Sequence, residues 1–128
     1  MKNKKQITLM VSVFLFGLII SFLSCEEADK EQAKLTISNQ SGRVLQYTTW
    51  NGTRFNSENS SYNLYYGDKA KNDVEPGTAY IYFTVGYEKV RTQDLITLKK
   101  DEEKIFYIYD STRVIKTTNN ESCTLSEL

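Results

Sequence analysis

Residues 79–85, AYIYFTV, are the stretch that decides the fold. Its apolar side chains are Ile81, Phe83 and Val85, and they alternate with Tyr80, Tyr82 and Thr84. Alternation with a period of two among β-branched and aromatic residues predicts a half-buried strand. We therefore expect the apolar face to cover a core and the tyrosines to lie on the opposite face.

Segments of the same kind recur along the chain at spacings near ten residues, separated by turn residues. The only proline lies within residues 68–78, which we interpret as a turn-containing connection. This rhythm predicts an all-β domain, specifically a small antiparallel β-sandwich, Ig-like and of about seven strands, with a small barrel as the alternative. The other expected strands are residues 35–38, 43–50, 53–55, 62–66, 91–98, 104–110 and 112–117.

The segment RVLQYTTW, residues 43–50, illustrates how faces are assigned from alternation. Strict period two puts Val44, Gln46, Thr48 and Trp50 on one face and Leu45, Tyr47 and Thr49 on the other. Asn51-Gly52 follows directly, and this dipeptide favours a type I′ turn because both central residues need a positive φ. A hairpin to residues 53–55 is therefore expected.

The N-terminal segment has the composition of a secretory signal peptide. Residues 1–6 carry three lysines and no acid, and residues 7–23 carry no charge at all. The alternative is an uncleaved transmembrane anchor, although a span needs about 20 apolar residues. Basic residues before an apolar run stay in the cytoplasm, so both interpretations leave the chain after residue 25 outside it.

A cysteine stands at the boundary between this apolar run and the polar sequence EEADKEQ. The stretch Phe22-Leu23-Ser24-Cys25 resembles the lipobox of bacterial lipoproteins, although Phe22 stands where leucine is usual. The resemblance implies that Cys25 receives a diacylglyceryl group and that signal peptidase II cuts before it. Acyl chains on Cys25 hold a protein on a membrane, and they are the only prosthetic chemistry that we expect.

These observations divide the chain into four parts. Residues 1–24 are the expected signal peptide, and residues 25–34 are the lipidated cysteine with a polar tether. Residues 35–118 are the β-sandwich domain, and residues 119–128 are expected to be a loose C-terminal tail. Once Cys25 is acylated, Cys123 has no partner for an intramolecular disulfide. The implied location is the bacterial cell envelope, outside the cytoplasm, with the outer membrane or cell surface favoured.

Composition excludes several classes of function. The chain has no histidine, which removes Ser-His-Asp triads, Cys-His dyads and histidine-ligated zinc. Neither a phosphate-binding loop nor a nucleophile elbow is present, so we expect no enzymatic activity and no metal site. The chain has 16 basic and 16 acidic residues, and residues 1–24 contain three of the basic ones, which leaves a net charge of −3. A mildly acidic domain argues against nucleic acid.

Aromatic residues supply the one positive indication of function. All nine tyrosines and the only tryptophan follow Cys25. Side chains with a flat apolar face and a polar tip suit protein interfaces and stacking on sugars. Trp50, Tyr62, Tyr65 and Tyr66 flank an Asn/Ser-rich loop and are the candidate binding residues. The alternatives are that Trp50 belongs to the core and that tyrosines on a sheet only form cross-strand ladders.

Three functional hypotheses remain. The leading one is a lipid-anchored envelope protein whose β-domain binds a protein or a glycan without catalysis. The second is a structural or masking protein without a small ligand, and the third is carboxylate-based chemistry on a polysaccharide. The segments PGTAYIYF, RTQDLITL and IFYIYDSTRVI also resemble, in style, small all-β lipoproteins of spirochetes. That resemblance implies no activity.

Overall fold

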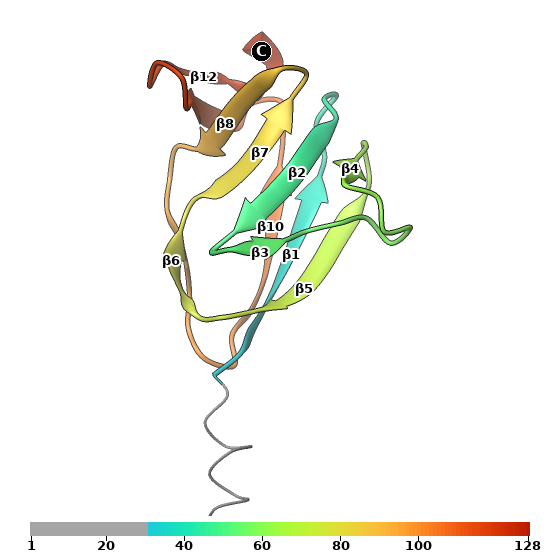
Figure 1. Ribbon diagram of the computed structural model, residues 1–128, viewed down its shortest axis with the longest axis vertical. Helices are drawn as coiled ribbons and strands as arrows, with labels where there is room; N and C mark the ends of the chain where they lie inside the picture. The colour runs from blue at the N-terminus through green and yellow to red at the C-terminus, as the bar shows by residue number, and fades with distance from the viewer. Residues whose placement is uncertain (1–30) are drawn as a thin grey trace, which may run out of the picture. The chain divides into compact units, whose positions relative to one another are not determined.

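The computed structural model describes residues 31–128, and its clearest feature is the hairpin that contains the AYIYFTV stretch (Figure 1). Strand β7 (Ile81–Val85) pairs antiparallel with β8 (Glu88–Thr92). The three apolar side chains of β7 are buried, and Tyr82 is exposed. The prediction from alternation is therefore confirmed for this strand.

The fold is an all-β sandwich, as predicted. The larger sheet has seven strands in the order β12-β11-β8-β7-β2-β3, with β4 also paired to β2; the smaller has the order β10-β1-β5, and β6 and β9 form a ladder of their own. The remaining strands are β1 (Ala33–Asn39), β2 (Leu45–Trp50), β3 (Thr53–Arg54), β4 (Asn63–Leu64), β5 (Lys69–Val74), β6 (Gly77–Ala79), β9 (Ile96–Leu98), β10 (Glu103–Ile108), β11 (Arg113–Lys116) and β12 (Ser122–Thr124), followed by the 3-10 helix η1 (Leu125–Glu127).

All of these pairs are antiparallel except β1 with β10, which is parallel. The eight segments expected from the sequence thus correspond to twelve shorter strands within residues 31–128. In Figure 1, β1 and β10 lie behind β2 and β7, so the two main sheets face each other. Apolar side chains from both sheets form a single buried cluster, in which Leu35 and Ile37 of β1 are fully buried. No disulfide supports this core within residues 31–128, since Cys123 is a free thiol.

Strand β2 corrects the face assignment made from strict alternation. The pairing of β2 with β7 shifts register between Gln46 and Thr49, where a β-bulge places an extra residue. Leu45 and Trp50 are therefore both buried although their spacing is odd, and Tyr47 is exposed. The expected Asn51-Gly52 hairpin is confirmed, because both residues have positive φ and β3 pairs back on β2.

The stretch 91–98 was expected to be one strand, but it is divided between β8 and β9. The division occurs after Thr92, whose buried hydroxyl accepts a hydrogen bond from the Ile81 amide and donates one to the Asp94 carbonyl. A side chain that bonds to the local backbone offers an alternative to the strand ladder. The hairpin therefore bends here, and β9 pairs with β6 instead of continuing β8.

Residues 68–78 were expected to be a connection, and that expectation is wrong. Residues 69–74 form β5, an edge strand of the smaller sheet, with Ala70 and Val74 buried. The charged residues between them hid the strand in the sequence, but charged side chains are what protect an exposed sheet edge from aggregation. β1 also begins at Ala33, so the expected tether ends two residues earlier than predicted.

The C-terminal residues 119–128 are packed onto the domain, which corrects the expectation of a loose tail. β12 pairs with β11, and Cys123 and the fully buried Leu125 join the core. The Leu125 amide also donates to the Thr112 carbonyl. Cys123 and Leu125 lie two residues apart, so a short half-buried strand was detectable in a segment otherwise rich in Ser, Thr and Asn.

The predicted signal peptide, Cys25 and the tether up to residue 30 lie outside the described residues. Within residues 31–128, no helix has the length and apolar content needed to cross a bilayer.

Candidate functional site

The outward side of the seven-stranded sheet carries a group of exposed tyrosines among amides and cations. Tyr47 on β2 and Tyr82 on β7 are 46% and 45% exposed, and Tyr62, just before β4, is 44% exposed. The register places β2 between β4 and β7, so these side chains come from adjacent strands. We call this surface the tyrosine face, and it consists of Gln46, Tyr47, Arg54, Tyr62, Tyr82 and Lys89.

The bulge in β2 is what brings Tyr47 to this face. Tyr47 has a φ of 53°, in the left-handed region that a residue with a Cβ adopts at a cost of about 1–3 kcal/mol. Its ring stacks on that of Tyr62, with centroids 4.5 Å apart and planes 4° from parallel. The Tyr47 amide also donates a hydrogen bond to the Tyr62 carbonyl. The strained backbone is therefore held by contacts that present two aromatic rings to solvent.

Two open hollows lie next to one another on this side of the sheet. The central hollow, of about 350 Å³, is lined by Tyr47, Tyr82, Phe83, Thr84, Lys89, Val90 and Thr117. The distal hollow, of about 460 Å³, is lined by Gly42, Arg43, Val44, Gln46, Asn63, Tyr65, Val85 and Gly86. Gln46 and Thr84 are cross-strand partners, so the two hollows meet at this pair. Both volumes fall in the range of ligand pockets, although these hollows are shallow and open.

A chain of amide groups connects the distal hollow to its tyrosine. The side-chain Nε2 of Gln46 donates to Oδ1 of Asn63 at 3.1 Å, and Nδ2 of Asn63 donates to the Tyr65 hydroxyl at 3.3 Å. β2 begins and β7 ends at the end of the domain opposite the start of β1 (Figure 1). The distal hollow therefore opens at the end of the domain farthest from where the chain enters it.

Cations accompany the aromatic rings. The Arg54 guanidinium lies 5.9 Å from the centroid of the Tyr47 ring, and that of Arg91 lies 3.9 Å from the centroid of the Tyr80 ring. Such contacts between a cation and the face of an aromatic ring contribute about 0.5–1 kcal/mol at exposed sites. Lys89 is exposed and borders the central hollow. Cations on β3 and β8 thus flank the rings on β2 and β7.

Hydrogen bonding with the Tyr47 side chain raises the pKa of the Tyr62 phenol above its ordinary value. Tyr62 is therefore a neutral phenol at any physiological pH. Tyr62 contributes no negative charge to the tyrosine face.

The structure separates the four candidate binding residues predicted from the sequence. Tyr62, Tyr65 and Tyr66 are exposed, and the first two contribute to the stacked pair and the distal hollow. The prediction that Trp50 is a surface binding residue is wrong. Its side chain is fully buried, and its Nε1 donates a hydrogen bond to the Ala79 carbonyl at 3.1 Å. The alternative that Trp50 belongs to the core is confirmed.

Sequence reasoning missed Tyr47, Tyr82 and Lys89. Tyr82 was assigned correctly to the outer face but was interpreted as part of a structural ladder only. Its ring does contact Tyr80 edge to face, with centroids 6.4 Å apart. Tyr47 was missed because strict alternation did not anticipate the bulge. The odd spacing of Leu45 and Trp50, two large apolar residues in one strand, was the available signal.

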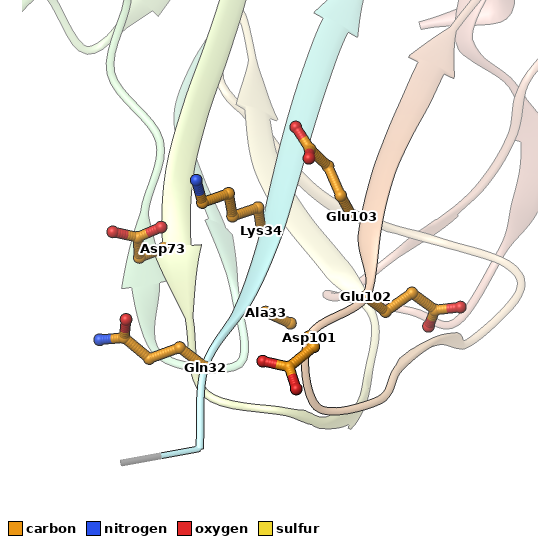
Figure 2. Close-up of a pocket in the computed structure, with 7 residues that line it drawn as sticks. All are labelled: Gln32, Ala33, Lys34, Asp73, Asp101, Glu102 and Glu103. Atoms are coloured by element: carbon orange, nitrogen blue, oxygen red, sulfur yellow. The ribbon is translucent and has the colours of Figure 1, made fainter. Parts of the chain in front are cut away.

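A third hollow, of about 310 Å³, lies where β1 begins and contains four carboxylates (Figure 2). The carboxylate groups point in different directions in Figure 2 and do not converge on one position. Glu102 accepts a hydrogen bond from the Lys99 amide, and Glu103 forms an ion pair with Lys71 at 3.0 Å. Within residues 31–128, no three acidic or cysteine side chains are grouped to hold a metal ion. Two of the four carboxylates, those of Glu102 and Glu103, therefore have structural partners.

Comparison with known proteins gives no match: no family model matches this chain, and neither does any curated protein at a significant level.

Proposed function

We propose that the chain is a lipid-anchored lipoprotein of the bacterial cell envelope, and that its β-domain binds a glycan or a protein without catalysis. The observation that carries the binding role is the tyrosine face. Strands β2 and β7 and the residue just before β4 contribute exposed rings to it, and one ring is held there by strained backbone. Strain of this kind is retained where surrounding contacts enforce it, and it concentrates at functional positions.

The geometry favours a glycan over a protein as the ligand. Sugars bind to proteins through stacking of their apolar faces on aromatic rings and through hydrogen bonds from amide and hydroxyl groups. Tyr82 and Tyr47 supply rings at the central hollow, and Gln46 and Asn63 supply amides at the adjoining one. Tyrosine offers a rigid ring with a polar tip at little entropic cost. A protein partner is the alternative outcome of the test.

The anchor is supported by the sequence around Cys25. Two or three acyl chains on one cysteine hold a protein on a membrane far more firmly than one chain. An anchored domain meets its ligand at a high effective concentration, so shallow hollows suffice for useful avidity. Metabolic labelling with palmitate tests this part of the proposal. Wild type should incorporate label and fractionate with the envelope, whereas Cys25→Ser should do neither.

A glycan-array screen of the full chain, purified in detergent, tests the binding role. We expect specific glycans to be retained by the wild type and lost in Tyr82→Ala. A pull-down from solubilised envelope then separates a glycan from a protein ligand. Retention of no glycan and of no specific protein partner would refute the binding role.

A further inference from the structure

The outward positions of the seven-stranded sheet around the tyrosine face carry several cations. Four cations project outward from this sheet, on β3, β8 and β11: Arg54, Lys89, Arg91 and Arg113. On β2, β7 and β8, the residues that lie between the buried ones and face outward include no Asp or Glu. A domain of nearly balanced charge therefore presents one sheet face on which these strand positions carry cations and no carboxylate.

These cations are not neutralised by ion pairs. The three ion pairs among residues 31–128 join Lys71 to Glu103, Lys104 to Glu102 and Lys116 to Glu121. None of them includes a cation of the tyrosine face. The outward side of the smaller sheet is different, because there Lys71 and Glu103 pair across β1 and Lys34 lies between Asp73 and Glu103 in the register. Arg54, Lys89 and Arg91 are therefore without a carboxylate partner of this kind.

We propose that the tyrosine face binds an anionic glycan, a polysaccharide whose sugars carry carboxylate or phosphate groups. This inference rests on the proposed function and specifies its ligand class. Lys89 lines the central hollow together with Tyr47 and Tyr82, so one sugar can stack on a ring while its acidic group meets the Lys89 ammonium. Arg54, over the Tyr47 ring, supplies a planar donor that suits carboxylate and phosphate oxygens.

Charge complementarity distinguishes this ligand from a neutral sugar. A neutral glycan would leave the two cations without a partner, whereas an acidic one pairs with them next to rings that exclude water. The raised pKa of the Tyr62 phenol keeps that group neutral, so it does not repel the acidic group. The attraction is expected to weaken as salt concentration rises, because exposed charges are screened.

The test uses matched probes against the full chain in detergent. The first pair is oligogalacturonate and the same oligosaccharide with its carboxyls methyl-esterified, and the second is phosphomannan oligosaccharide before and after dephosphorylation. We expect at least one acidic form to bind and its neutral form to bind at least about tenfold more weakly, which corresponds to roughly 1.4 kcal/mol. The carboxylate and phosphate arms show which group the site prefers.

Variants then place the ligand on the tyrosine face. Lys89→Gln and Arg54→Gln should each weaken binding of the acidic glycan by about threefold to tenfold, with little effect on any residual neutral binding. Tyr47→Asn removes a ring but keeps a residue that tolerates the left-handed backbone, so loss of binding in this variant reports the ring and not the fold. The matched controls are Lys69→Gln and Tyr109→Ala, on and next to the smaller sheet.

Each result has a defined meaning. Equal binding of acidic and neutral forms refutes this inference but leaves a glycan-binding role in place. Binding of neither form of either probe, with a specific protein captured from solubilised envelope, refutes the glycan as ligand. Acidic binding that survives Lys89→Gln, Arg54→Gln and Tyr47→Asn, or that is lost equally in the two controls, refutes the assignment to this face.

Discussion

Replacement of Trp50 distinguishes a core residue from a binding platform. The side chain is fully buried and makes one hydrogen bond, from Nε1 to the Ala79 carbonyl. Burial of an aromatic side chain of about 150–250 Å², at roughly 25 cal/mol per Å², contributes about 4–6 kcal/mol. Measured replacements of buried Trp or Phe by Ala cost about 3–5 kcal/mol. Trp50→Ala should therefore remove most of the stability of a domain worth about 5–15 kcal/mol.

Trp50→Phe is the variant that stays folded. It loses the hydrogen bond, worth about 1 kcal/mol, and leaves a space that costs roughly 1 kcal/mol more. The melting temperature should fall by about 10 °C, since each kcal/mol corresponds to about 4–8 °C in a domain of this size. The assay is thermal unfolding followed by far-ultraviolet circular dichroism. The control is Tyr66→Ala, at a position 72% exposed, which should change stability by less than about 0.5 kcal/mol.

Ligand binding completes the test of Trp50. Trp50→Phe should keep the affinity of the wild type for any ligand of the tyrosine face, because the ring does not reach that surface. An unchanged melting temperature together with lost binding would show that Trp50 is a platform, and the burial argument would be wrong.

Three further predictions concern the elements that support the site. Leu125→Ala should cost about 2–5 kcal/mol in urea unfolding, because the tail that holds this fully buried side chain is part of the core; a cost below about 0.5 kcal/mol would mean that the tail is loose. Asn39→Ala should cost about 2–4 kcal/mol, since the buried amide donates to the Leu64 carbonyl and this acceptor would lose its partner; unchanged thermal stability would contradict this. The Lys71 ammonium lowers the pKa of Glu103 below 4.5, so the stabilisation is present above that pH and is lost as pH falls through the folded-state value. The wild type should therefore exceed Glu103→Gln in urea midpoint at neutral pH and match it in strong acid, and a difference that persists in acid would refute the pairing.

The sequence was sufficient where strands follow a regular period and insufficient where tertiary contacts decide. β7 follows from alternation because its two faces differ in polarity along the whole strand. The bulge in β2 does not, because a bulge depends on how the neighbouring strand is paired. β5 was missed because an edge strand needs few apolar residues, and the parallel pairing of β1 with β10 joins segments almost seventy residues apart. Local patterns contain no information about such pairings.

The same limit explains the partial prediction of the site. Abundant tyrosine indicated a binding surface, and Tyr62 and Tyr65 do contribute to it. The prediction of Trp50 as a binding residue was wrong. Its position in the sequence, beside an Asn/Ser-rich loop, does not determine which way the ring points. Cations such as Lys89 gain their importance only when β8 is placed two strands from β2. A total charge near zero does not indicate that cations are concentrated on one face of the folded domain.

The bulge in β2 explains both the packing of the core and the position of Tyr47 on the tyrosine face. Leu45 and Trp50 are both fully buried at an odd spacing, which regular pleating forbids, so one residue between them must be added without a ladder partner. That extra residue is pushed outward, and placing a tyrosine there costs about 1–3 kcal/mol of backbone strain, where glycine or asparagine would cost less. The core requires the bulge but does not require Tyr47 in it. A large aromatic ring at a position whose backbone disfavours it is explained by what the ring does outside the core, namely stack on Tyr62 and line the central hollow.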